Sequence, residues 1–260
     1  MEQLQLVLGG RDELPTTTAH QSRLQIYAPT RKPKFETRII ETAWGTAKII
    51  GKIGQGHADV MEAIFSQASK WREFNDGTMQ ILVDPHRVRV AASSGNYKLS
   101  YERLNDVTTD LMQTVIDMSV PGRDYNMDKG TLITRIQDSI IDAPEHSKTR
   151  SSSFGKNRKM WRVDLGEPFV RLLNKDISLY YDPKPIAKLN SGVSQAVARN
   201  LLSHTVAPAA GWLIDNAIKA VGAGGDSKKM WERRNEIIED ADGLKLSGLV
   251  VEGGRIKRIK

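Results

Sequence analysis

The chain has 260 residues, 39% of them hydrophobic, which predicts two globular domains with cores of ordinary size. It lacks both a run of about 18 apolar residues and the basic-then-apolar order of a signal peptide, so we expect a soluble, cytoplasmic protein. The absence of cysteine excludes disulfides, thiolate zinc sites and cysteine nucleophiles, and the net charge of +7 suggests an anionic partner, most commonly nucleic acid.

The first segment shows no sustained periodicity. Residues 1–36 contain three consecutive threonines and the prolines Pro29 and Pro33, and they predict a flexible, partly basic arm. The next residues, 37–53, are rich in isoleucine and threonine, which favours one strand or a short hairpin.

Three helices are predicted in the following part of the chain. Apolar residues at helical spacing indicate a helix over 57–71, which a short strand at 79–83 follows. Asp84 and Pro85 are typical of a helix start, and this second helix ends near residue 92. Ser100 is expected to cap a third, long helix that reaches residue 118.

Two or three strands are predicted to follow the third helix. They lie at 131–141, 160–165 and 177–181, with a flexible loop at 147–158 and a helical turn at 169–173. The order of strand, helix, strand, helix, helix and hairpin is that of a winged helix. We therefore predict a first winged-helix domain over residues 37–182.

The same order is predicted again after Asp182-Pro183-Lys184-Pro185, which we take as a domain boundary. Helices are expected over 191–204 and 211–221, and a third helix, capped by Asp226 or Ser227, runs to about residue 246. Two β-prone runs around Gly253-Gly254 predict a closing hairpin. The predicted fold class is α+β, with two tandem winged-helix (helix-turn-helix) domains, the second over residues 183–260, and a flexible N-terminal arm.

The last long helix has an unusual charge distribution. Its cations lie at its N-terminal end and its acids lie in its C-terminal part, which is opposite to what the helix dipole favours, by about 0.3–1 kcal/mol per charge. Binding of DNA phosphates would explain this reversal, and ordinary solvated side chains are the alternative. Arg234 and Asn235 are candidates to contact guanine and adenine.

Two other basic segments extend the predicted DNA surface. The closing hairpin carries cations on one side, and the loop of the first domain is rich in lysine and arginine. The third helix of the first domain is acidic, so we expect this domain to pair protomers or to touch DNA only through its basic loop. The predicted DNA-binding residues are Lys228, Lys229, Arg233, Arg234, Asn235, Arg255, Lys257, Arg258, Lys260, Lys156, Arg158 and Lys159.

With tandem winged helices, a mobile arm and a basic C-terminal recognition helix, the chain resembles the replication initiator (Rep) proteins of theta-replicating bacterial plasmids. The resemblance rests on the helix at 54–71, Val83-Asp84-Pro85, residues 101–118, and residues 189–199 and 230–258, and it spans about 37–260. It implies that the C-terminal domain binds repeated origin sequences (iterons) in double-stranded DNA. It also implies that the N-terminal domain dimerises and makes a second DNA contact, and that the protein recruits host helicase and opens an A·T-rich region. The expected location is then the bacterial cytoplasm, on the plasmid or nucleoid, with a role in plasmid copy control, as a monomer or homodimer.

The sequence argues against an enzyme. The five histidines are scattered, and none forms a His-x-His or His-x-x-x-His pair that would suit a metal site. The glycine-rich stretch at 51–56 fits neither the Walker nor the Rossmann spacing. Ser153-Phe154-Gly155-Lys156 matches a Ser-x-x-Lys pattern without its companion motifs. We therefore expect no catalytic residues, no metal and no cofactor.

The functional hypothesis from the sequence is a sequence-specific DNA-binding initiator of plasmid replication. A winged-helix transcriptional repressor is an alternative in the same physical class. A winged-helix module that binds protein is an alternative in a different class.

Overall fold

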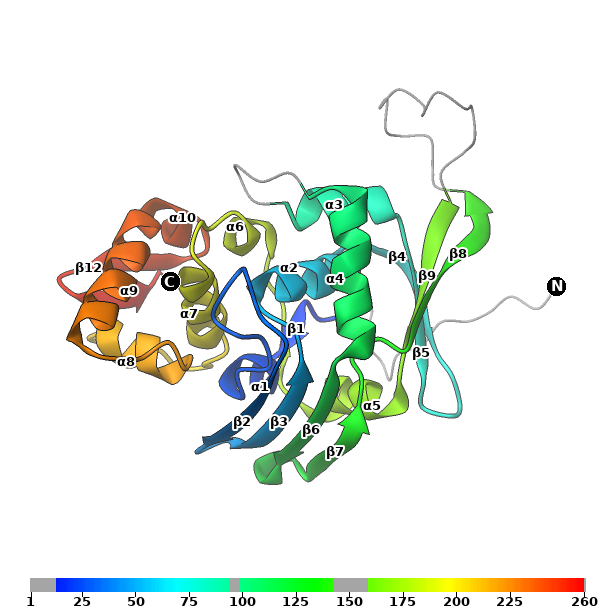
Figure 1. Ribbon diagram of the computed structural model, residues 1–260, viewed down its shortest axis with the longest axis horizontal. Helices are drawn as coiled ribbons and strands as arrows, with labels where there is room; N and C mark the ends of the chain where they lie inside the picture. The colour runs from blue at the N-terminus through cyan, green and yellow to red at the C-terminus, as the bar shows by residue number, and fades with distance from the viewer. Residues whose placement is uncertain (1–12, 94–98, 143–158, 260) are drawn as a thin grey trace.

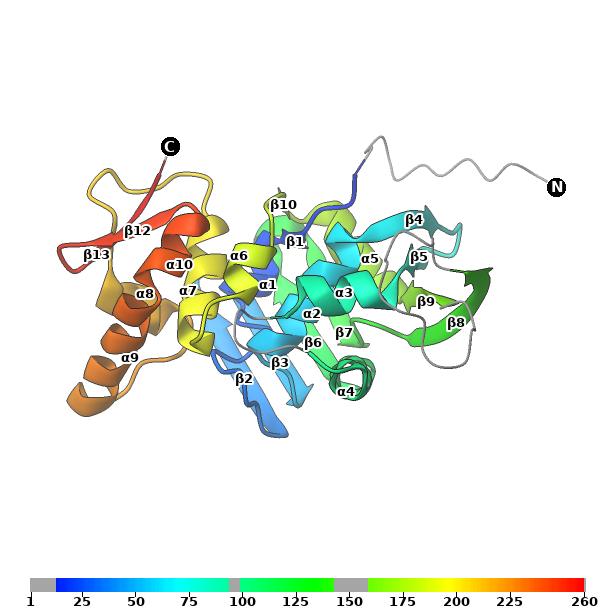
Figure 2. The same ribbon diagram turned by 90° about the horizontal axis from the view of Figure 1, so that it is seen from above.

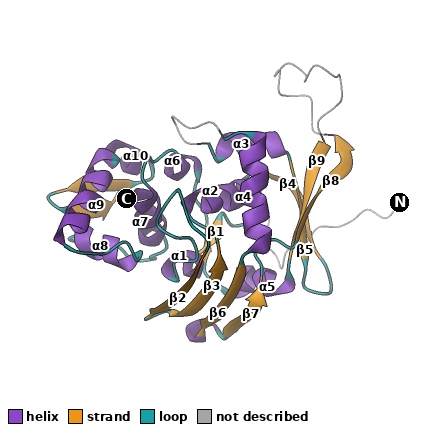
Figure 3. Ribbon diagram, viewed as in Figure 1, coloured by secondary structure: helices purple, strands orange, loops and turns teal. Residues whose placement is uncertain are grey.

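The computed structural model describes residues 13–93, 99–142 and 159–259 (Figure 1). We call residues 13–182 the N-terminal half and residues 183–259 the C-terminal half. Strands are concentrated in the N-terminal half, whereas the C-terminal half is largely helical (Figure 3). The buried hydrophobic side chains form two clusters, one from residues 14–173 and one from residues 186–256. The domain boundary predicted at residue 182 lies between these clusters.

The segment before the first long strand is folded. β1 (Thr17–Thr18) pairs antiparallel with β10 (Ser178–Leu179), and α1 (Ala19–Arg23) is mostly buried. The expectation of a flexible arm over residues 1–36 is therefore wrong for residues 13–36, and residues 1–12 lie outside the described residues.

This segment also contacts the C-terminal half. The guanidinium of Arg23 donates to the carbonyl oxygen of Ser203, and that of Arg31 donates to the carbonyl oxygen of Leu189. These partners lie 180 and 158 positions apart in the sequence. The periodicity of a short segment does not reveal contacts with residues this distant in the sequence. For this reason the sequence did not indicate that residues 13–36 are ordered.

Two four-stranded antiparallel sheets form much of the N-terminal half (Figure 1). The first sheet consists, in spatial order, of β2 (Glu36–Thr42), β3 (Gly45–Gly51), β6 (Val115–Val120) and β7 (Tyr125–Gly130), with the short 3-10 helix η1 (Pro121–Arg123) between the last two. The second sheet consists, in spatial order, of β4 (Ala68–Glu73), β5 (Met79–Val83), β9 (Lys159–Leu165) and β8 (Arg135–Asp142).

Four helices complete this half. They are α2 (Gln55–Ser66), α3 (Pro85–Ala91), α4 (Tyr101–Gln113) and α5 (Glu167–Lys175). The predicted caps of α3 and α4 are confirmed, because Asp84 accepts from the backbone N–H of His86 and Ser100 from that of Arg103.

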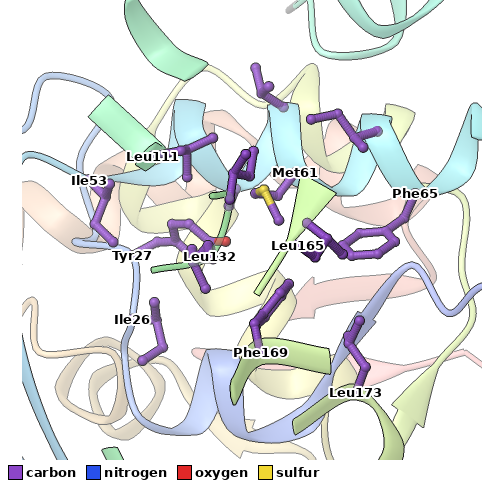
Figure 4. Packing of buried hydrophobic residues seen from close by; sticks show 14 of the residues in the cluster. Ile26, Tyr27, Ile53, Met61, Phe65, Leu111, Leu132, Leu165, Phe169 and Leu173 are labelled. Atoms are coloured by element: carbon purple, nitrogen blue, oxygen red, sulfur yellow. The ribbon is translucent and has the colours of Figure 1, made fainter. Parts of the chain in front are cut away.

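The core of the N-terminal half is centred on α2. This helix packs against α3 and α4 and also reaches α7 (Gly192–Leu202) of the C-terminal half. Figure 4 shows Met61 and Phe65 of α2 facing the side chains of α5, and the rings of Phe65 and Phe169 lie 6.3 Å apart between centroids. The buried face of α2 therefore fixes both the N-terminal core and its contact with the other half.

Two predicted helices of this half are shorter than expected. The helix predicted over 57–71 ends at Ser66, and Trp71 lies in β4, where it pairs with Ile81. The helix predicted to reach residue 118 ends at Gln113, and Met118 is buried in β6. At the ends of these two helices, the apolar residues fit both the spacing of a helix and the alternation of a strand. Pairing with neighbouring strands decides that they form strands.

The C-terminal half follows the predicted order more closely. Its elements are α6 (Lys184–Ala187), α7, β11 (Trp212–Leu213), α8 (Ile214–Ala220), α9 (Ser227–Glu239), α10 (Ala241–Leu246), β12 (Leu249–Glu252) and β13 (Arg255–Arg258). The predicted Gly-Gly hairpin is confirmed, with β12 and β13 antiparallel and both glycines at positive φ. β11 adds to this hairpin and gives the spatial order β11-β13-β12. The third helix, predicted as one element to residue 246, is divided at Asp240 into α9 and α10.

No helix within the described ranges combines the length and the apolar character that a bilayer crossing requires.

Candidate nucleic-acid interface

The N-terminal end of α9 presents two free cations. Asp226 caps the helix by accepting from the backbone N–H of Lys229 at 2.8 Å. Lys228 and Lys229 are both exposed in the first turn, and among the described residues neither ammonium group has a hydrogen-bond or ion-pair partner. The positive end of the helix dipole and two free ammonium groups therefore coincide.

The two predicted arginines of α9 are engaged within the protein. Arg234 makes a bidentate ion pair with Asp215 of α8, with both N–O distances at 2.5 Å, and this hydrogen bonding lowers the pKa of Asp215. Arg233 pairs with Glu236 one turn further along α9. DNA contact by Arg233 or Arg234 stays a prediction. To bind a phosphate or a base, either arginine would have to give up its ion pair within the protein.

The acidic part of α9 has a structural role. Asp240 is buried and accepts from the backbone N–H groups of Asn190 and Ser191, each at 2.9 Å. Glu236 accepts from the hydroxyl of Ser191. These carboxylates thus lie at the positive N-terminal end of α7, where their charge is favourable. Contact with the start of α7 therefore accounts for two of the acids at this end of the helix, Glu236 and Asp240, without phosphate binding.

The β12–β13 hairpin carries the second set of predicted residues. Arg255 donates to the carbonyl oxygen of Gly211 at 3.2 Å, and Arg258 donates to that of His204 at 3.0 Å. Lys257 is exposed and pairs across the hairpin with Glu252 at 2.8 Å. Figure 2 shows the tip of this hairpin and the start of α9 at the same end of the molecule. The structure therefore brings these two predicted groups to one end, and Lys260 lies outside the described residues.

The basic loop of the N-terminal half is only partly described. Lys159 is exposed at the first position of β9. Lys156 and Arg158 lie outside the described residues. Their role in DNA binding stays a prediction.

A cleft of about 780 Å³ lies between the two halves. α4 lines it with Arg103 and Val107, and α9 lines it with Arg233, Glu236 and Glu239. In Figure 2, seen from above, α4 and α9 both lie toward the lower edge of the molecule. The third helices of the two predicted domains thus share one face.

Sequence reasoning missed two cations in this cleft. Arg31 and Lys32 line it from the segment that was predicted to be a flexible arm. Arg31 also lies 3.8 Å from Asp59. The basic stretch was visible in the sequence, but its position between the halves depends on tertiary contacts.

A buried charge network fixes one half against the other. Arg199 of α7 donates to Asp59 at 2.7 Å and to both carboxylate oxygens of Glu62 at 2.8 Å, and these acids belong to α2. Its third guanidinium nitrogen, Nη1, donates to the carboxamide oxygen of Gln55 at 2.7 Å. The charged groups are almost completely buried and are paired, so the network satisfies the condition under which buried charge is tolerated.

His57 of α2 lies beside the cleft. Its side chain is buried, accepts from the backbone N–H of Gly54 and lies 3.2 Å from Asp110. Burial lowers the pKa of His57 from its ordinary value of 6.5, although Asp110 acts in the opposite direction. Burial thus disfavours the protonated imidazole.

Within the described ranges, histidine, aspartate and glutamate side chains do not gather in groups of three that could hold a metal ion. Each of the five histidines is isolated in the sequence as well.

Comparison with known proteins bears on the fold. No protein-family model and no curated protein matches the chain. The fold is similar to that of domains 2 and 3 of RctB in a crystal structure, with a TM-score of 0.55 and 12% sequence identity. The match covers 94% of this chain and 96% of that chain, so it includes both halves. The mixed α/β fold of this chain is therefore shared with domains 2 and 3 of RctB, and membership of the Rep family stays a prediction.

Proposed function

We propose that the chain is a non-enzymatic, sequence-specific DNA-binding protein, a plasmid replication initiator that binds repeated origin sequences and promotes origin opening. The observation that carries the proposal is the pair of free, exposed lysines, Lys228 and Lys229, at the N-terminal end of α9. Phosphate contacts from such cations supply much of the affinity for DNA. The sequence resemblance to Rep initiators and the fold shared with domains 2 and 3 of RctB support this choice.

We assign a winged helix to the C-terminal half. The order of α7, β11, α8, α9 and the β12–β13 hairpin, with β11 added to the hairpin, supports this assignment. In such a domain α9 is the recognition helix and the hairpin is the wing. In the N-terminal half, α2, α3 and α4 followed by β8 and β9 support a second winged helix, to which the β2-β3-β6-β7 sheet is added.

A DNA-binding measurement over a range of salt concentrations tests the proposal. We expect Lys228→Ala with Lys229→Ala to weaken binding to all DNA sequences and to reduce the slope of log K against log salt by about 2, since each phosphate contact contributes about 0.9. The control is Lys184→Ala with Lys188→Ala, which removes the same charge from exposed positions at α6. Circular dichroism checks that each variant is folded. If the α9 variant binds with unchanged affinity and slope, the assigned interface is wrong.

The encoding DNA separates initiator from repressor. Tandem direct repeats beside an A·T-rich tract, protected by the protein in a footprint, are the expected result for an initiator. Protection of a lone palindrome would support a transcriptional repressor instead. Dimerisation through the N-terminal half and recruitment of host helicase are implied by the family resemblance and belong to the same proposal.

A further inference from the structure

The outward face of α9 carries exposed apolar side chains. Trp231 is 60% exposed and Ile238 is 56% exposed, and both lie away from the buried Met230 and Ile237 of the same helix. Tryptophan is usually largely buried, so a half-exposed tryptophan and isoleucine on one helix face indicate a surface that is covered in a complex.

These residues form a stripe with polar neighbours. Lys228, Trp231, Asn235 and Ile238 follow one another at spacings of three, four and three residues, which places them along one face of the helix. Among the described residues, the carboxamide of Asn235 makes no hydrogen bond. We call these four residues the α9 stripe.

The two arginines of α9 that were predicted to bind DNA lie off this stripe. Arg234 is directed to Asp215 on α8, and Arg233 is paired with Glu236. The side chains that α9 leaves available along the stripe are therefore one cation, one amide and two apolar groups.

We propose that the α9 stripe reads A·T base pairs in the major groove, with Trp231 and Ile238 against thymine methyl groups and Asn235 on adenine. This inference rests on the proposed function. The thymine methyl is the apolar group that the major groove presents, and asparagine matches the adenine edge. The stripe begins at the free cation Lys228, and Lys229 is its neighbour in the sequence. A partner that carries both negative charge and an apolar group in a groove therefore fits this stripe better than a neutral apolar protein surface does.

The experiment uses the full chain and DNA that carries deoxyuridine in place of thymidine. A preferred site is first selected from random duplexes with the wild-type protein. Each thymidine in that site is then replaced in turn by deoxyuridine, which removes only the methyl group and keeps the base pairing. We expect replacement at one or more positions to weaken wild-type binding about fourfold, the effect of about 0.8 kcal/mol for one buried carbon group.

The variants assign the contacts. Trp231→Ala and Ile238→Ala are each expected to bind more weakly and to lose sensitivity to deoxyuridine at a different position. The control is Leu246→Ala on α10, which removes an apolar side chain that is 74% exposed and lies off the stripe, and it should keep wild-type sensitivity. Sensitivity to a single methyl is a readout that a general loss of stability does not produce.

The outcomes separate the two proposals. If the wild-type protein binds no DNA, both the proposed function and this inference fail. If it selects a site in which no thymine methyl affects binding, or if Trp231→Ala and Ile238→Ala keep full sensitivity, only the inference fails. Loss of self-association in these variants with unchanged DNA binding would also overturn it, because the stripe would then be a protein contact.

Discussion

The polar side chains of α9 differ in whether they already have a hydrogen-bond or ion-pair partner within the protein. Arg233, Arg234, Glu236 and Asp240 each have a partner within the protein, whereas Lys228 and Lys229 have no side-chain partner among the described residues. A charged group that is already hydrogen bonded gives up that contact when it binds DNA, and a solvated ammonium group gives up only water and counterions. The two lysines are therefore the stronger candidates for phosphate contact, although the sequence ranks all the cations of this helix alike.

His57 provides a pH-dependent test at the scale of one residue. Its pKa in the folded protein is lowered by burial, so below about pH 6.5 the unfolded chain takes up a proton that folded His57 does not bind. The contribution of neutral His57 to the free energy of unfolding is thus complete above this pH. It is lost as the pH falls, by at most about 1.4 kcal/mol per pH unit.

We expect His57→Gln to flatten this dependence. Urea unfolding of both proteins between pH 8 and pH 5 measures the free energy of unfolding at each pH, with the range chosen to bracket the ordinary histidine value, about 6.5. His204, whose pKa is also lowered by burial, is unchanged in both proteins and its contribution cancels in the comparison. Parallel profiles for the two proteins would show that His57 titrates alike in the folded and unfolded states.

At the scale of elements, the third helix of the C-terminal half is divided at Asp240, the residue whose carboxylate contacts the start of α7. The carboxylate of Asp240 turns to the backbone N–H groups at the start of α7, and α10 begins at the next residue. The orientation of α9, and hence of its lysines, depends on this cap. The sequence shows the helical periodicity of the whole stretch but cannot show that one of its acids serves another helix.

Removal of this cap should lower stability. Asp240→Ala leaves the N–H groups of Asn190 and Ser191 without their acceptors, and an unsatisfied buried donor costs about 1–3 kcal/mol. Thermal or urea unfolding measures the loss. The control is Asp242→Ala at an exposed position of α10, where we expect a change within about 0.5 kcal/mol. Equal effects of the two substitutions would contradict the capping role.

For the whole molecule, the network around Arg199 joins two hydrophobic cores into one arrangement. α4 and α9 line the same cleft, so their relative position depends on how α2 and α7 are held together. The Arg199 contacts to Asp59 and Glu62 supply that connection. A fixed arrangement of the two halves keeps α4 and α9 at this cleft.

Breaking the network is expected to be strongly destabilising. Arg199→Met leaves two buried carboxylates without their main partner, a change that typically costs about 3–5 kcal/mol. Arg199→Met combined with Asp59→Asn and Glu62→Gln removes the unpaired charge and should recover much of the loss. Urea unfolding of the two variants checks this, with Arg171→Met, at an exposed arginine, as the control. If the single and triple variants are equally unstable, burial of unpaired charge is not the cause.

The sequence by itself determined the helices with strong caps and the closing hairpin, because these signals are local. Asp84, Ser100 and the Gly253-Gly254 turn act within a few residues of their own position. Only the tertiary structure decided that residues 13–36 are ordered, that Met118 lies in a strand and that Arg234 faces Asp215. In each of these cases the partner is distant in sequence or lies on another element, and a pattern read along one segment contains no information about it.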